Sequence, residues 1–159
     1  MGRDKARLRL GRRTLLGHVR AQAQKLGIPV RIVRRDLVTR CGPLGGVYTG
    51  LKTSRAEAEI FLACDMPFVS AAWLRLLLKE WENEKRAVFT AIGHSAGFPF
   101  VTPHSALPVV ERMISQKQFA LQTLATALKS RFLRPPRDRE WELMNVNTPD
   151  DWQVARERV

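Results

Sequence analysis

The chain has 159 residues, of which 45% are hydrophobic and 26% are charged, and its formal net charge is +12 at pH 7. This length and composition predict one compact soluble domain over residues 1–159 and exclude a transmembrane protein, because no apolar run approaches the ~20 residues that cross a bilayer. No apolar signal core follows the basic N-terminus, and two cysteines are too few for a disulfide framework, so we expect a cytoplasmic protein without membrane contacts.

The positive charge is concentrated at the front of the chain. Residues 1–40 contain 12 Lys or Arg against 2 acidic residues, whereas residues 41–159 contain 15 against 13. A basic segment of this kind attracts polyanions, either nucleic acid or small phosphorylated substrates, or it is a solvated face with no partner. No aromatic residue precedes Tyr48, so the segment lacks the stacking platforms of a single-strand-binding surface. We therefore expect a small phosphorylated ligand and no specific nucleic acid.

The first part of the chain alternates predicted helices and strands. Helical spacing of apolar residues predicts a helix over Thr14–Leu26 that ends at Gly27. Alternating apolar and basic residues predict a strand with one buried face over Ile28–Arg34. After a loop, a short helix is predicted over Val47–Lys52. The almost wholly apolar segment Glu59–Cys64 predicts a strand that is covered on both faces.

The second part continues the same alternation. Ser70 can cap the next predicted helix, and Thr148 followed by Pro149 and two acidic residues predicts the start of the last helix. Strands that alternate with helices predict an α/β layered fold with a mostly parallel sheet. The elements expected between them are a helix over Ala71–Asn83, a strand over Arg86–Ile92, a turn over Gly93–Gly97, a strand over Phe98–Val101, helices over Leu107–Gln116 and Phe119–Lys129, and a strand near Arg131–Leu133.

Two clusters have residue types that suit a bound phosphate. Lys5 can neutralise phosphate as a point charge, or it is an ordinary surface lysine. Cys41–Gly46 (CGPLGG) lies between a predicted strand and a predicted helix, where glycines let the backbone approach a ligand and helix-start amides favour anions. The segment is not a P-loop, because no G-K-[ST] follows the glycines, and a tight turn without a ligand would also explain it.

Two further clusters carry carboxylate and carboxamide groups. Asp65 follows the most apolar predicted strand, and ligands of open α/β sheets bind outside the carboxyl ends of strands. A carboxylate at this position can hold Mg²⁺ together with substrate phosphates, or it caps the turn before Pro67. Asn145 and Asn147 point the same way if their segment is extended, so they can hydrogen-bond one ligand, or they satisfy loop backbone.

In this order the clusters resemble motifs of the molybdenum cofactor guanylyltransferase family. Those motifs are L-A-G-G-x-S-x-R-M-G-x-D-K, G-P-L-A-G, C-D-x-P and N-x-N-T-P. They match MGRDK at 1–5, GPLGG at 42–46, CDMP at 64–67 and NVNTP at 145–149, and FPF at 98–100 is similar to a proline-centred strand of the family. The resemblance covers essentially the whole chain. It implies a three-layer Rossmann-like nucleotidyltransferase fold with a mostly parallel sheet, here without the first strand and glycine-rich loop.

The resemblance also implies roles for particular residues. Lys5, Asp65 and Asn147 would be catalytic, and Asp65 would hold Mg²⁺. Asn145 and Asn147 would lie at the pterin phosphate. The nucleotide-binding positions would be Lys5, Asp36, Gly42, Pro43, Leu44, Gly45 and Asp65.

The implied reaction is in-line attack by the terminal phosphate of molybdopterin on the α-phosphorus of GTP, with release of pyrophosphate. The partners would be GTP, the molybdopterin substrate and, transiently, proteins that mature molybdoenzymes. Two other interpretations remain open: a related nucleotidyltransferase that uses CTP or a sugar phosphate, and an inactive nucleotidyltransferase-like binding module. Because Met1 falls inside the first motif, we expect this chain to be nearly inactive without the preceding loop.

Overall fold

The computed structural model describes residues 8–159, which divide into two compact units built from separate stretches of the chain. Unit 1 consists of residues 8–30, Leu62–Arg75 and Pro135–Val159. Unit 2 consists of Arg31–Phe61 and Leu76–Arg134. The expectation that 1–159 form a single domain stays a prediction. No helix within the described residues is both long and apolar enough to cross a membrane.

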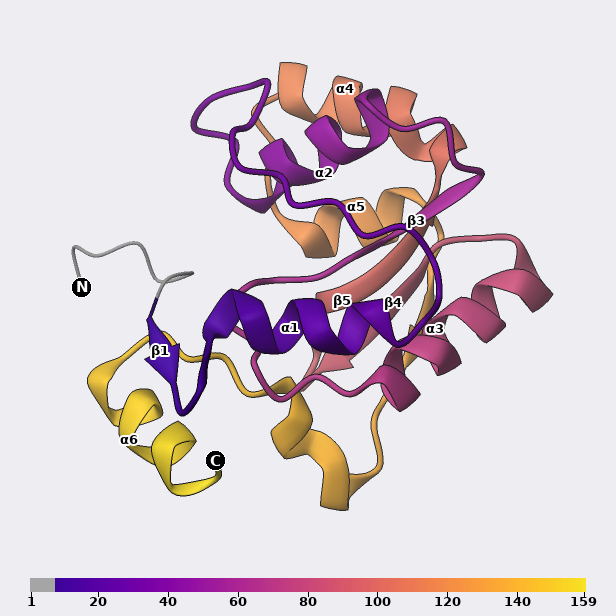
Figure 1. Ribbon diagram of the computed structural model, residues 1–159. Coiled ribbons are helices and arrows are strands. Elements are labelled where there is room, and N and C mark those ends of the chain that lie inside the picture. The colour runs from indigo at the N-terminus through magenta and orange to yellow at the C-terminus, as the bar shows by residue number, and fades with distance from the viewer. Residues whose placement is uncertain (1–7) are drawn as a thin grey trace. The chain divides into compact units, whose positions relative to one another are not determined.

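Unit 2 is built around a four-stranded sheet (Figure 1). Its strands are β3 (Ala58–Phe61), β4 (Val88–Ile92), β5 (Ser95–Pro103) and β6 (Arg131–Leu133), in the spatial order β3-β5-β4-β6. β5 runs antiparallel to both of its neighbours, whereas β4 and β6 are parallel. The predicted α/β fold class is confirmed. Three of the four strands point the same way, but the sheet is mixed because β4 returns directly as β5 through a hairpin.

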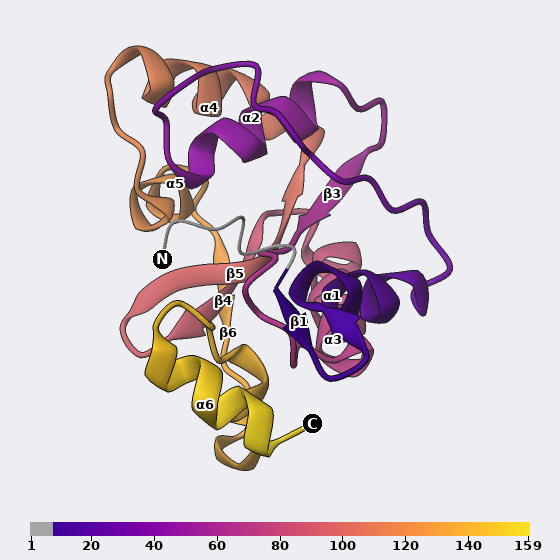
Figure 2. The same cartoon turned by 60° about the vertical axis from the view of Figure 1, so that its left-hand side comes forward.

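Helices lie on both sides of this sheet, which gives unit 2 three layers (Figures 1 and 2). On one side are α2 (Pro43–Lys52), α4 (Leu107–Ser115), which follows the short helix η2 (His104–Ala106), and α5 (Leu121–Ala127). The unit 2 part of α3 (Ala71–Glu84) lies on the other side in both views. The core under α2, α4 and α5 is formed by Leu44, Val47, Leu51, Phe89, Phe100, Val110, Met113 and Leu124, among others.

Unit 1 contains a small hairpin, three further helices and the start of α3. The hairpin joins β1 (Arg9–Leu10) to β2 (Arg13–Thr14), and it was not predicted from the sequence. Thr14 caps α1 (Leu15–Gln24) by accepting a hydrogen bond from the Gly17 N–H. The remaining helices are η3 (Arg137–Leu143) and α6 (Pro149–Glu157). As predicted, Thr148 caps α6, and it forms a capping box with Asp151.

The predicted strand over Ile28–Arg34 is wrong, because the structure places no strand there. None of its apolar residues is fully buried: Ile28, Val30 and Val33 are 43%, 38% and 41% exposed, and Ile32 is half-buried. A period-two pattern predicts a strand only where one face is buried.

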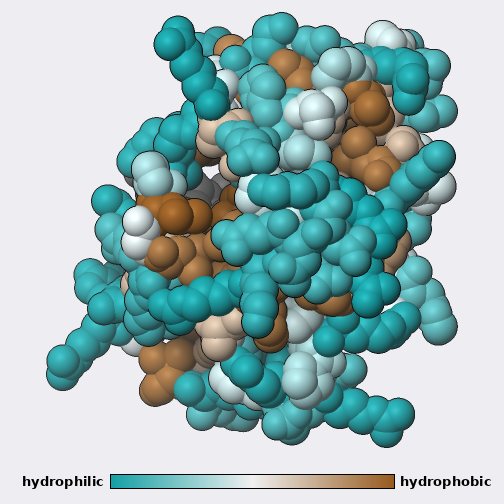
Figure 3. All heavy atoms as spheres, turned by 90° about the vertical axis from the view of Figure 1, so that its right-hand side faces the viewer, coloured by the Kyte–Doolittle hydropathy of each residue, from teal (hydrophilic) through white to brown (hydrophobic). Residues whose placement is uncertain are grey.

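Figure 3 shows one face of the molecule, on which hydrophobic groups interrupt the hydrophilic surface in several places.

Two other boundaries near the predicted site also differ. β3 ends at Phe61 rather than at Cys64, and its four residues are half-buried, not covered on both faces as predicted. In the described sheet it lies at one edge, where it pairs only with β5. Helix α2 begins at Pro43, four residues before the predicted start at Val47. Pro43 suits the first helical position because proline has no N–H to leave unpaired.

Candidate functional site

Asp65 lies in the turn that follows β3, with three residues separating it from Phe61. Its side chain is half-buried. The Asp65 backbone carbonyl accepts a hydrogen bond from the Val146 N–H at 2.8 Å. This bond joins the turn to the asparagine segment, 81 residues further along the chain and also in unit 1.

The asparagine segment alternates in burial. Val146 is 0% exposed and packs with Leu10, Leu15 and Ala155, whereas Asn145 and Asn147 are exposed. The Asn147 N–H donates to the Asp151 carboxylate at 2.9 Å, so the cap of α6 also fixes this segment. The structure therefore brings both asparagines to the turn that carries Asp65, with Val146 as the buried anchor between them.

Interactions that were not visible in the sequence stabilise the segment that follows this turn. The Arg139 Nη2 donates to the Ser70 hydroxyl at 3.0 Å, and Arg139 Nε donates to the Glu142 carboxylate at 2.6 Å. This hydrogen bond to Glu142 raises the pKa of Arg139 above its usual value. Ser70 in turn accepts from the Trp73 N–H at the start of α3, as its predicted capping role requires. These contacts tie η3 to the segment that follows Asp65.

The glycine segment of unit 2 is a helix start and not an open loop. Gly42 precedes α2 with φ 52° and ψ −142°, and Pro43, Leu44 and Gly45 form the first turn. The Leu44 N–H donates to the Cys41 carbonyl and the Gly45 N–H donates to the Gly42 carbonyl, both at 3.2 Å. The predicted contribution of these residues to nucleotide binding thus rests on close backbone approach and on the positive end of the helix dipole.

Asp36 lies against this first turn. A Cβ atom added at Gly45 would come within 2.7 Å of Asp36 Oδ2 and 3.2 Å of its carboxyl carbon, so glycine leaves the space that the carboxylate occupies. The resemblance implied nucleotide roles for both residues, but nothing in the sequence predicted their contact. The family motif quoted above has alanine at this position, and the chain therefore departs from it where Asp36 packs.

The remaining predictions concern Lys5 and the metal. Lys5 lies outside the described residues. Within residues 8–159, no three His, Cys, Asp or Glu side chains cluster to form a metal site. Asp65 and the two exposed asparagines nevertheless supply oxygen ligands of the kind that Mg²⁺ accepts, with water and substrate phosphate completing the coordination. The residues present therefore fit a Mg²⁺ ion that arrives with a nucleotide.

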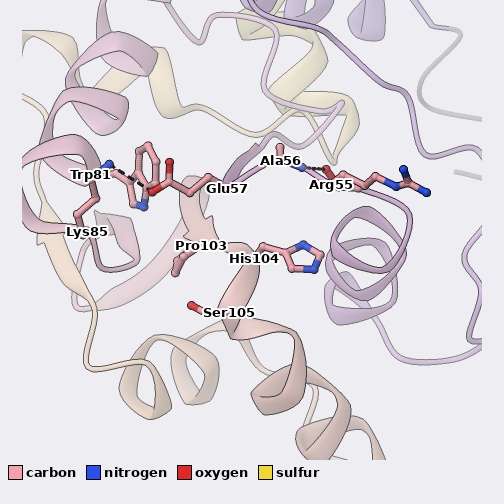
Figure 4. Close-up of a pocket in the computed structure, with 9 residues that line it drawn as sticks. Arg55, Ala56, Glu57, Trp81, Lys85, Pro103, His104 and Ser105 are labelled. Carbon is pink, nitrogen blue, oxygen red and sulfur yellow. Dashed lines mark hydrogen bonds and ion pairs between the residues drawn. The ribbon is translucent and has the colours of Figure 1, made fainter.

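A groove of about 510 Å³ lies elsewhere in unit 2, and no predicted site residue lines it. In Figure 4, Lys85 lies beside Trp81 and Glu57, whereas the Arg55 side chain points away from them. Lys85 Nζ is 4.3 Å from the Trp81 ring centroid and 3.4 Å from the Glu57 carboxylate. The groove is at the amino end of β3, opposite to the end where ligands of open α/β sheets bind. We assign it no part in the chemistry.

Replacing Gly42 with alanine should lower the free energy of unfolding by about 1–3 kcal/mol, because a φ of 52° with a ψ of −142° strains any residue with a Cβ. No atom lies within 4 Å of the added Cβ, so this loss would come from the backbone alone. Urea denaturation measures it. Gly46→Ala is the matched control: Gly46 is inside the helix, and a Cβ there would make only an ordinary contact of 3.8 Å with Asp36 Oδ1, so the change should be neutral or slightly stabilising. Equal losses in the two variants would contradict the strain argument.

The sequence matches a known family and several known proteins. A family model described as MobA-like NTP transferase domain matches residues 1–131. A protein from Opitutus terrae named "Probable molybdenum cofactor guanylyltransferase" is 34% identical over 183 residues, which cover 99% of this chain and 89% of that protein. A protein of the same name from Flavobacterium johnsoniae is 28% identical, and the match covers 73% of this chain but only 62% of that protein.

The fold is also similar to that of solved structures. The molybdopterin-guanine dinucleotide biosynthesis protein A from Archaeoglobus fulgidus superimposes with a TM-score of 0.79 at 23% sequence identity. The match covers 99% of this chain and 91% of that one. At this identity the likeness establishes the fold, and the sequence matches carry the family assignment.

Proposed function

The chain belongs to the MobA-like NTP transferase family, and we propose that it transfers the guanylyl group of GTP to the phosphate of molybdopterin. Membership in the family makes it a nucleotidyltransferase. The choice of GTP and molybdopterin rests on the names of its relatives and on the NVNTP segment at 145–149.

One observation carries the proposal: the hydrogen bond from the Val146 N–H to the Asp65 carbonyl. It joins the backbone of the turn that carries Asp65 to the segment that carries the exposed Asn145 and Asn147, both in unit 1. In the proposed reaction a phosphate oxygen of molybdopterin forms a bond to the α-phosphorus, and the bond between that phosphorus and the bridging oxygen breaks. Pyrophosphate leaves with the electron pair. Such a transfer needs positioning and charge neutralisation rather than a covalent nucleophile.

Each predicted residue has a place in this scheme. Asp65 would hold Mg²⁺, which when bound neutralises charge on the phosphates. Asn145 and Asn147 would hydrogen-bond the phosphate of the pterin, and Lys5 would neutralise the triphosphate. Asp36 would accept hydrogen bonds from the nucleotide, and the residues that line the nucleotide would be Gly42, Pro43, Leu44 and Gly45.

The test is pyrophosphate release by the purified protein with GTP or CTP, each with and without molybdopterin. We expect whatever release this chain supports, however slow, to occur with GTP and only when molybdopterin is present. Faster release with CTP would identify cytidylyl transfer instead. Nucleotide binding without any release, in the presence of both substrates, would favour the binding module.

A further inference from the structure

Thr49 links Asp36 to the first turn of α2. The Thr49 hydroxyl accepts a hydrogen bond from the Leu37 N–H at 2.9 Å and donates one to the Gly45 carbonyl at 2.8 Å. Leu37 directly follows Asp36, and Gly45 is the residue against which the Asp36 carboxylate lies. Thr49 is 7% exposed, so its hydroxyl is largely shielded from competing water. One side chain thus sets the distance between the Asp36 segment and the helix.

Arg31 provides a second anchor at the other end of the segment. Its Nη1 donates to the Thr53 hydroxyl at 2.8 Å, and its Nη2 donates to the Gly50 carbonyl at 2.9 Å and to the Glu59 carboxylate at 2.6 Å. The guanidinium therefore holds the chain to the end of α2 and to β3. Asp36 lies between this anchor and the bond from Leu37 to Thr49.

These tethers are needed because the segment has little else to hold it. Residues 31–40 form no helix or strand. Val33 and Leu37 are 41% and 58% exposed and Ile32 and Val38 are half-buried, so no apolar side chain of the segment is fully buried. A segment with few buried contacts opens at low free-energy cost. The hydrogen bonds of Thr49 and Arg31 are accordingly the interactions that keep the Asp36 carboxylate in one place.

We infer that Thr49, supported by Arg31, is a positioning residue that holds Asp36 ready for the nucleotide. The inference rests on the proposed function, because the role of Asp36 in nucleotide binding is part of it. If the tether is cut, the nucleotide must order the segment as it binds, and affinity falls by that cost. Because Asp36 would contact the ground state and the transition state alike, KM should change and kcat should not.

Thr49→Val tests this directly, since valine keeps the shape of threonine and removes both hydrogen bonds. We expect the KM for the nucleotide to rise about tenfold, with kcat nearly unchanged. A tenfold change in affinity corresponds to the free energy that one hydrogen bond typically contributes, here the bond that tethers the Leu37 N–H. Thr49→Ser keeps the hydroxyl and should restore most of the affinity. Thr126→Val is the control, because the Thr126 hydroxyl also donates to the carbonyl four residues earlier in its helix, that of Gln122, but it is exposed and lies in α5, away from the Asp36 segment.

Two further measurements separate positioning from general stability. In an Asp36→Asn background, Thr49→Val should have no further effect on nucleotide affinity measured by calorimetry; additive losses would overturn the inference. Hydrogen exchange of the Leu37 amide should accelerate in Thr49→Val and not in Thr126→Val. Unchanged Leu37 exchange would show that the tether does not hold the segment.

The same experiment distinguishes this inference from the proposed function. Faster Leu37 exchange in Thr49→Val, together with an Asp36→Asn variant that binds nucleotide normally, would establish the tether but remove Asp36 from nucleotide binding. That result would contradict both the role given to Asp36 and the positioning inference. Slower turnover in Thr49→Val with an unchanged KM would overturn the positioning inference alone.

Discussion

Replacing Asp65 with asparagine should lower guanylyl transfer by about 10²–10³-fold, the cost of losing one preorganised electrostatic contact in a transition state. Asparagine has nearly the same shape and keeps one side-chain oxygen, but it has no charge to hold Mg²⁺. The hydrogen bond to the Val146 N–H uses the backbone carbonyl of residue 65, so the turn should keep its conformation. The loss would then report the chemistry of the carboxylate rather than a change in fold.

Calorimetry provides the second measurement for this variant. One carboxylate is too little for a dedicated Mg²⁺ site, so the ion should bind only together with the nucleotide. GTP affinity should therefore increase on addition of Mg²⁺ in the original protein and stay constant in Asp65→Asn. Asp150→Asn is the control, because Asp150 is an exposed carboxylate in the first turn of α6, outside the capping box. If Asp65→Asn keeps the full increment, another residue holds the metal.

Local hydrogen bonds explain why several elements were predictable from the sequence. The caps formed by Thr14, Ser70 and Thr148 each join residues three apart, so a short window of sequence contains both partners. The common direction of Asn145 and Asn147 could be predicted for a similar reason. In an extended segment, a buried Val146 places its two neighbours on the opposite side. The roles of Asn145 and Asn147 in binding the pterin stay predictions.

Contacts between distant residues were not predictable in this way. The apolar alternation over 28–34 is a local pattern. It carries no information on whether a neighbouring strand is present to pair with the segment, and in the structure the segment forms no strand. The bond between Thr49 and Leu37 spans 12 residues, and that between Arg31 and Glu59 spans 28. The packing of Asp36 at Gly45 likewise depends on the missing Cβ of a residue in another element. The motifs thus identified the candidate residues, whereas the hydrogen bonds and packing contacts that hold those residues in place were found only in the structure.

The sheet of unit 2 depends on a similarly distant contact, the stacking of Phe89 on Phe100. These side chains come from neighbouring strands β4 and β5 and are both 0% exposed, with ring centroids 4.3 Å apart and ring planes at 7°. Phe61 and Phe98 also lie near Phe100, at 5.3 and 5.2 Å. Phe100 is thus the centre of an aromatic cluster that joins the three strands β3, β4 and β5 to the core under α2.

Replacing Phe100 with alanine should therefore lower the free energy of unfolding by about 3–5 kcal/mol, because it leaves a cavity and removes the stacked ring. Globular proteins have only about 5–15 kcal/mol of stability, so this single change would remove a large share of it. Urea denaturation gives the value, and Phe100→Leu, which fills more of the cavity, provides a milder variant if the alanine variant does not fold. Phe132→Ala is the matched control: Phe132 is 38% exposed on β6 and lies 6.4 Å from the Phe89 ring, so its loss should be much smaller. Equal losses in the free energy of unfolding at positions 100 and 132 would mean that the aromatic cluster does not dominate the stability of the sheet, and that helix packing stabilises unit 2 without it.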